Sequence, residues 1–124
     1  MQDEPTPTEL VKAVADFLRT EIAPVIKGHN AFKLRVGINA LDLVVRQLTL
    51  EAPADAAEHS RLKALLGSEG SLLELNRALS ERIAKGEVGP DTPGLKEHLW
   101  QTTMDKLAVD QPGYASYKRE AGKA

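Results

Sequence analysis

Four polar side chains follow one another along the most apolar helical stretch of this 124-residue chain, residues 32–48. Arg35, Asn39, Asp42 and Arg46 are spaced i, i+4, i+7 and i+11, so an α-helix places them on one continuous ridge. Two arginines beside an amide are donors suited to a carboxylate, a phosphate or another protein. The alternative is that the ridge is the solvent-exposed side of its helix, with Asp42 and Arg46 as a surface ion pair.

Two further charges lie on helix faces that are otherwise apolar. Glu21 does so in the first expected helix, and Lys106 does so in the last. A charge on a core-facing stripe is usually paired, or it reaches solvent from a helix end. In the paired case Glu21, Arg35, Asn39 and Lys106 form one polar network, either a site or structural glue. In the other case Glu21 reaches solvent and Lys106 pairs with Asp110. We take the four as candidate contacts for a ligand or a partner.

The helices that must position these side chains are marked by start and stop signals. Thr6 and Ser71 each begin a capping box, with Glu9 and Glu74 three residues later. Proline interrupts the helical pattern twice, and Gly86 is a typical helix end. The expected helices cover residues 7–23, 30–50, 53–67, 71–86 and 93–109. No run of alternating apolar and polar residues indicates a strand.

The second helix is apolar on two nearly opposite sides, which predicts a central helix packed by neighbours on both. Gly37 lies among its apolar residues and suggests that another helix approaches closely there. In the last helix the expected core stripe is Leu95, Leu99, Trp100, Thr103, Met104 and Leu107. The sequence therefore predicts an all-α, up-and-down bundle of about five helices, with the helix at about 30–50 central. We expect one domain over 1–124, frayed at about 1–5 and 119–124.

The composition and motif content of the chain argue against several classes of function. Sixteen basic and 18 acidic residues are interspersed, so no basic stripe predicts a nucleic-acid partner. The chain has no cysteine, no long apolar run and an acidic start, so we expect a cytoplasmic protein without a membrane partner. Nucleotide-binding and hydrolase motifs are absent. Asp55 and His59 lack a third ligand, and His98, Gln101 and Asp105 indicate a solvated helix face. We therefore expect no metal, no cofactor and no catalytic residues.

Three segments carry a family resemblance: "QDEPTPTELVKAVADFL", "FKLRVGINAL" and "TTMDKLAVDQPGYASY". Together they resemble an uncharacterised bacterial domain-of-unknown-function family of small helical proteins, along nearly the whole chain. Members of that family are encoded near aminoglycoside-phosphotransferase-like kinases and acyl-CoA dehydrogenases. The resemblance implies an accessory role beside such an enzyme and brings no catalytic residues. Arg35, Asn39, Lys106 and Asp110 fall within its recognisable segments.

Two function classes remain. The first is a non-enzymatic accessory or protein-interaction domain that partners a phosphotransferase-like enzyme, with homo-oligomerisation left open. The second is a small-molecule-binding domain for a phosphorylated or CoA-like anion, with Arg35 and Lys106 as contacts. An exposed apolar patch favours the first, and an enclosed pocket with convergent polar groups favours the second. An enzyme is the third and weakest reading, because the chain has none of the parts of a kinase.

Overall fold

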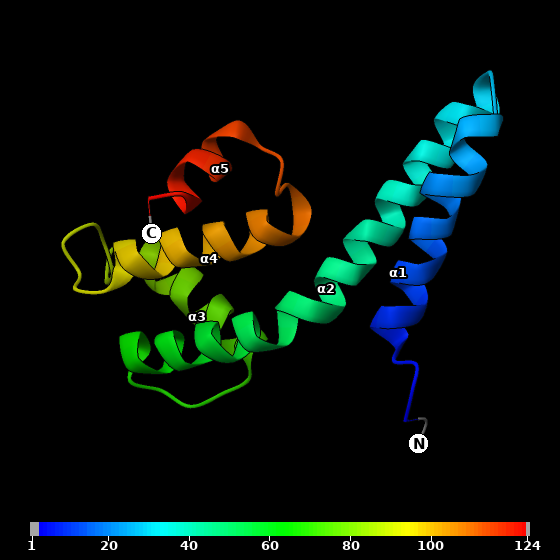
Figure 1. The fold of residues 1–124 in the computed structure, drawn as a ribbon. Coiled ribbons are helices and arrows are strands. Elements are labelled where there is room, and N and C mark those ends of the chain that lie inside the picture. The colour runs from blue at the N-terminus through cyan, green and yellow to red at the C-terminus, as the bar shows by residue number, and fades with distance from the viewer. Residues whose placement is uncertain (1–2, 124) are drawn as a thin grey trace. The chain divides into compact units, whose positions relative to one another are not determined.

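The computed structural model describes residues 3–123, and these residues form helices without any strand (Figure 1). The all-α class is therefore confirmed, although the helices differ in part from those expected. The elements are α1 (Pro7–Phe17), the π-helical turn η1 (Leu18–Ile22), the 3-10 turn η2 (Ala23–Val25), α2 (His29–Leu66), α3 (Leu72–Ala84), α4 (Leu95–Asp110) and α5 (Ala115–Ala121).

The local helix signals are confirmed. The backbone N–H of Thr6 donates to Glu9 Oε2 at 2.7 Å, and the N–H of Glu9 donates to Thr6 Oγ1 at 3.2 Å. Ser71 and Glu74 make the same reciprocal pair, at 2.8 and 3.2 Å, at the start of α3. These bonds satisfy amide groups that have no partner inside the helix. Gly86, at φ 76°, follows the last residues of α3 in the left-handed conformation that favours glycine.

The expected break at Pro53 is wrong, because the helices expected at 30–50 and 53–67 are joined in one helix, α2, which ends at Leu66. Proline removes one backbone hydrogen bond and crowds the carbonyl four residues earlier, but it leaves the other bonds of the helix intact. Alanines at 52, 54, 56 and 57 surround Pro53, and alanine has the highest helix propensity. The strong local propensity explains why the helix continues past the proline.

Contacts within the chain group its residues into two compact units, Met1–Glu51 and Ala52–Ala124. In unit 1, α1 runs antiparallel beside the first part of α2 (Figure 1). The least exposed apolar residues of this hairpin form a seam, with positions spaced i, i+4, i+7 and i+11 on each side. They are Val11, Ala15, Leu18 and Ile22 before the turn, and Leu34, Ile38, Leu41 and Val45 in α2. Only Ala15 and Ile38 are fully buried among the described residues of unit 1.

The hairpin of unit 1 is joined on one side by an ion pair. The Arg19 guanidinium donates from one nitrogen to both carboxylate oxygens of Asp42, at 2.8 and 2.6 Å. Another of its nitrogens bonds Asp16 at 2.9 Å. The close helix approach expected at Gly37 is not found, since a Cβ placed there would have no atom within 4 Å apart from its own helix backbone and chain neighbours.

Unit 2 has a conventional leucine core. Leu62 and Leu66 near the end of α2 pack with residues of α3 and with Leu95 at the start of α4. The buried cluster is Leu62, Leu66, Leu75, Leu79, Val88 and Leu95, with Leu65, Leu72 and Ala78 packed against it. The short helix α5, which was not among the expected helices, packs against α4. This core fixes the α2 and α4 faces that carry the polar cluster described below.

Replacing Pro53 tests whether α2 is continuous in solution. In a helix interior proline costs about 3 kcal/mol relative to alanine, so Pro53→Ala should raise the free energy of unfolding by about 1–3 kcal/mol. Pro7 is the matched control, because it occupies the first turn of α1, where proline costs little. Pro7→Ala should stay within about 0.5 kcal/mol of wild type. Urea unfolding followed by circular dichroism measures both, and a neutral or destabilising Pro53→Ala would contradict a continuous helix.

Candidate functional site

The buried face of α4 is not the one expected. Leu99 is 46% exposed and Trp100 is 54% exposed, so the predicted stripe is wrong at both positions. Leu95 of that stripe is buried as predicted, but the other buried residues are His98 and Val109, with Thr102 half-buried between them. These four residues are spaced i, i+3, i+7 and i+14, which is helical spacing, but two of them are polar. The apolar periodicity of the sequence therefore predicted a neighbouring face of α4 as the buried one.

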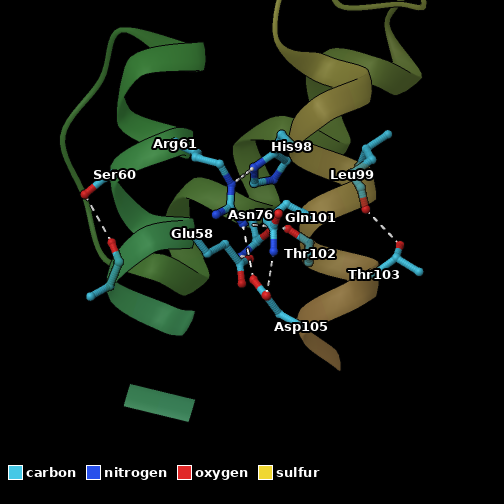
Figure 2. A network of polar contacts seen from close by, with 11 residues as sticks. Glu58, Ser60, Arg61, Asn76, His98, Leu99, Gln101, Thr102, Thr103 and Asp105 are labelled. Atoms are coloured by element: carbon cyan, nitrogen blue, oxygen red, sulfur yellow. Dashed lines mark hydrogen bonds and ion pairs between the residues drawn. The ribbon is translucent and has the colours of Figure 1, made fainter. Parts of the chain in front are cut away.

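His98 contacts Arg61, a residue that sequence reasoning did not single out (Figure 2). Arg61 Nε donates to His98 Nδ1 at 3.4 Å, and a second guanidinium nitrogen donates to Thr102 Oγ1 at 3.3 Å. The carboxylate of Asp105 lies 3.8 Å from the same nitrogen. The guanidinium thus links the last part of α2 to three successive turns of α4.

The polar cluster is extended by neutral and acidic side chains. Asn76 of α3 donates its amide hydrogen to Glu58 Oε1 of α2 at 2.9 Å, and Gln101 donates to Asp105 at 2.8 Å (Figure 2). No polar side-chain atom of the described residues is both buried and without a hydrogen-bond partner. The cluster is therefore fully satisfied where it is buried, as a stable polar network requires.

The surroundings of His98 keep its ring neutral. Burial is the largest cause that lowers its pKa, the positive charge of Arg61 lowers the pKa further, and Glu58 opposes both. Because Nδ1 accepts from Arg61, the single proton of the neutral ring is on Nε2. His98, which the sequence placed on a solvated face, is 3% exposed, so that interpretation is wrong.

A pocket of about 310 Å³ opens beside this pair in unit 2. It is formed between the end of α2 and the start of α4. Its walls are Arg61, Ala64, Leu65, Pro93, Gly94, Glu97 and His98. The volume is at the lower end of the range for small-molecule sites.

The residues predicted from sequence as ligand or partner contacts do not line this pocket. Glu21, Arg35 and Asn39 are exposed in unit 1, and Lys106 is exposed in unit 2. Asp42 of the ridge accepts a hydrogen bond from Arg19, which lies on the other arm of the hairpin. None of the four residues is therefore buried, and their role as surface contacts stays a prediction.

A second feature is an apolar surface on unit 1. Leu10, Val14 and Phe17 each precede a seam residue by one position, as do Gly37, Ala40 and Val44 on α2. In two antiparallel helices, the residue just before a seam residue points to the same side of the pair in both helices. These residues therefore share one side of the hairpin. Leu48 lies at its edge. We call this set the apolar face, comprising Leu10, Val14, Phe17, Gly37, Ala40, Val44 and Leu48.

The apolar face is exposed, and it is bordered toward the turn by Glu21 and Lys33, the other two residues that precede seam positions. Its five large side chains are between 37% and 53% exposed. One step forward from the seam gives the opposite side, which holds Arg19 and the ridge of Arg35, Asn39, Asp42 and Arg46. Nine of the fourteen exposed large apolar residues in the described chain belong to unit 1, although it is the smaller unit, and five of these nine are on the apolar face. An apolar concentration of this kind is typical of an interaction surface.

Residues 3–123 contain no group of three or more His, Asp or Glu side chains arranged to hold a metal ion. None of their helices combines the length and hydropathy needed to cross a membrane.

The lowered pKa of His98 predicts a dependence of stability on pH. The unfolded chain takes up a proton near the ordinary histidine pKa of about 6.5, whereas the folded ring resists protonation. The contribution of His98 is therefore fully present above about pH 6.5 and is lost as the pH falls toward the lowered folded pKa. Urea unfolding at about pH 7.5 and about pH 5.5 should show this loss for wild type, and a smaller loss for His98→Gln. His29→Gln, at an exposed residue, is the control and should retain the wild-type loss. An equal loss for His98→Gln would contradict the assignment.

Comparison with known proteins places the chain in a family. The model of the family described as "Domain of unknown function (DUF6285)" matches residues 24–114. This range includes all of α2, α3 and α4, and every residue of the Arg61–His98 cluster. No curated protein and no solved structure matches the chain. Because the match covers most of its length, the chain belongs to the DUF6285 domain family.

Proposed function

We propose that this chain is a non-enzymatic protein-interaction domain that associates through the apolar face of unit 1, and that a second copy of the chain covers this face. The observation that carries the proposal is the row of half-exposed Leu10, Val14, Phe17, Val44 and Leu48 on one side of the hairpin. Leaving such a row in water forgoes part of the stabilisation of about 1.5–3 kcal/mol that full burial of each side chain provides.

Unit 1 has little core of its own. A helical hairpin is a single layer, whereas stable domains bury apolar surface between at least two layers. Here the seam fully buries only Ala15 and Ile38 among the described residues, and one of them is merely a methyl group. The ion pair of Arg19 with Asp42 adds little, because exposed pairs contribute about 0–1 kcal/mol. A second hairpin would supply the missing layer and give a four-helix arrangement.

The shape of the apolar face favours a second copy. Leu10, Val14, Val44 and Leu48 lie toward the open end of the hairpin, whereas Gly37 and Ala40 lie toward the turn, at about the level of Phe17. A two-fold axis across the face would bring the bulky end of one copy onto the small-residue end of the other. The open space above Gly37 is then occupied, which accounts for a glycine that costs about 1 kcal/mol in a helix interior.

The area fits a weak, concentration-dependent pair. The face spans residues 37–48 along α2 and is two helices wide, so it measures roughly 18 Å by 20 Å, or about 360 Å². Two copies would together bury about 700 Å², which is the size of a transient contact. Glu21 follows Phe17 at the turn end of the face, so we propose it as a polar contact at the rim.

The resemblance adds a finer expectation, that the assembled chain serves a phosphotransferase-like enzyme as an accessory protein. Arg35 and Asn39 lie outside the apolar face and are exposed, so they would stay accessible to such a partner. We place its contacts there, while Lys106 is a further exposed contact on α4. Binding of a purified phosphotransferase-like enzyme to wild type, and its weakening by Arg35→Met, would test this part separately.

Phe17→Gln tests the association itself. The substitution places an amide at the centre of the apolar face and should weaken the dimer by at least about tenfold, or about 1.4 kcal/mol. Lys12→Gln introduces the same residue on the other side of α1 and is the matched control. Sedimentation equilibrium over a range of concentrations measures the dissociation constant of each. Wild type that stays monomeric throughout, or equal weakening by Lys12→Gln, would overturn the proposal.

A further inference from the structure

Helix α2 carries a second apolar stripe, on the side opposite the seam of unit 1. We call its four residues the outer stripe, comprising Phe32, Val36, Leu43 and Leu50. They are spaced i, i+4, i+11 and i+18, and a turn of about 100° per residue places them nearly opposite the seam residues of the same helix. Phe32 is 60% exposed and Val36 is 52% exposed. The sequence predicts a neighbour on each apolar side of this helix, and α1 occupies the seam side (Figure 1).

The width of the outer stripe indicates the shape of what covers it. Steps of four and seven residues place its members along one narrow line, which is the arrangement of a coiled-coil seam. Asn39 borders the line on one side, and Lys33, Gln47 and Glu51 separate it from the apolar face on the other. A helix that lies in a membrane surface needs a broad apolar side instead. The outer stripe is therefore suited to a single helix with an apolar stripe of its own.

The charges beside the outer stripe favour an acidic helix. Lys33 and Arg35 flank its first two members on opposite sides, as the e and g residues flank a coiled-coil seam. Helix α2 has no acidic residue before Asp42, and the carboxylate of Asp42 already accepts from Arg19. Among residues 3–123, neither Lys33 nor Arg35 forms an ion pair. Carboxylates on a facing helix would supply the counter-charges.

A second copy of the chain is a poor source of this helix. If two outer stripes paired in parallel, Lys33 of one copy would face Arg35 of the other. If they paired antiparallel, Arg35 of one copy would face Arg46 of the other. Like charges set against each other suppress pairing in both cases. The occupant that meets both the apolar and the charge pattern is a helix from a different protein.

We infer that the outer stripe docks an acidic amphipathic helix of a partner protein. The apolar side chains of that helix pack against Phe32 and Val36, and its carboxylates lie beside Lys33 and Arg35. This surface is on a different side of α2 from the apolar face, so the inference does not rest on the association of two copies. It also gives the exposed Arg35 of the ridge a chemically defined partner, a carboxylate.

The test titrates the full-length chain into a fluorescently labelled synthetic helical peptide of about three heptads, with leucine at a and d and glutamate at e and g. Fluorescence anisotropy should rise to saturation. The same peptide with lysine in place of glutamate should bind at least about tenfold more weakly, because it meets like charges. Absence of a saturable rise with the glutamate peptide, or equal affinity for the lysine peptide, would overturn the inference. Displacement of the glutamate peptide by phosphatidylserine vesicles would do so too, since a membrane would then be the occupant.

Two exposed positions assign the peptide to the outer stripe. Phe32→Gln and Lys33→Glu should each weaken binding of the glutamate peptide by at least about tenfold. Leu73→Gln removes an equally exposed apolar side chain from α3, and Lys12→Glu reverses an exposed charge on α1, so both controls should bind as wild type does. Thermal unfolding of the four variants confirms that the fold is retained. Wild-type affinity in Phe32→Gln or Lys33→Glu, or an equal loss in either control, would place the peptide elsewhere and contradict the assignment.

Discussion

The packing of Leu62 against Leu75 and their neighbours is the interaction on which unit 2 depends. These two leucines are the largest fully buried side chains of the described chain. Helices α2, α3 and α4 all contribute to their cluster, so its burial fixes the faces that the helices turn toward one another. Arg61 directly precedes Leu62, and His98 follows Leu95 by three residues. The polar pair is thus positioned by the apolar residues beside it, and the pocket is a consequence of that placement.

In unit 1, helical spacing also determines which side each residue faces, but this unit lacks a core comparable to that of unit 2. The residue before a seam position belongs to the apolar face at six of the eight positions, the exceptions being Glu21 and Lys33. The residue after each seam position of α2 belongs to the polar ridge. The ridge is already joined to η1 through Arg19 and Asp42, whereas nothing within the unit covers the apolar face. Because the two sides differ in this way, we propose that the apolar side of the hairpin associates with a second copy. The ridge side stays available for charged contacts.

Sequence reasoning succeeded where structure is set by a few neighbouring residues. Both capping boxes and the glycine after α3 have the predicted roles, because each depends on residues within one helical turn. The ridge at Arg35 to Arg46 was also predicted as one row, since helical periodicity alone determines it. Its bond from Arg19 to Asp42 was not predictable in this way, because the two residues meet only when the hairpin forms.

Sequence reasoning failed where the wider structure overrides a local signal. Pro53 is a helix breaker by type, but the alanines around it sustain α2. On α4, Trp100 appeared to be a core residue and His98 a surface residue, and the structure reverses both. Arg61 makes a buried histidine acceptable by giving Nδ1 a donor, and this partner lies 37 positions away in the sequence. The periodicity of a single helix cannot predict a partner that lies on another helix.

Amide hydrogen exchange of the wild-type chain at low and high protein concentration tests the central claim most directly. Association through the apolar face predicts that protection of residues 10–17 and 37–48 rises with concentration. Protection of the leucine core of unit 2, around Leu62 and Leu75, should stay the same in both samples. Protection of residues 10–17 and 37–48 that does not change with concentration, in a range where the chain sediments as a monomer, would contradict the account.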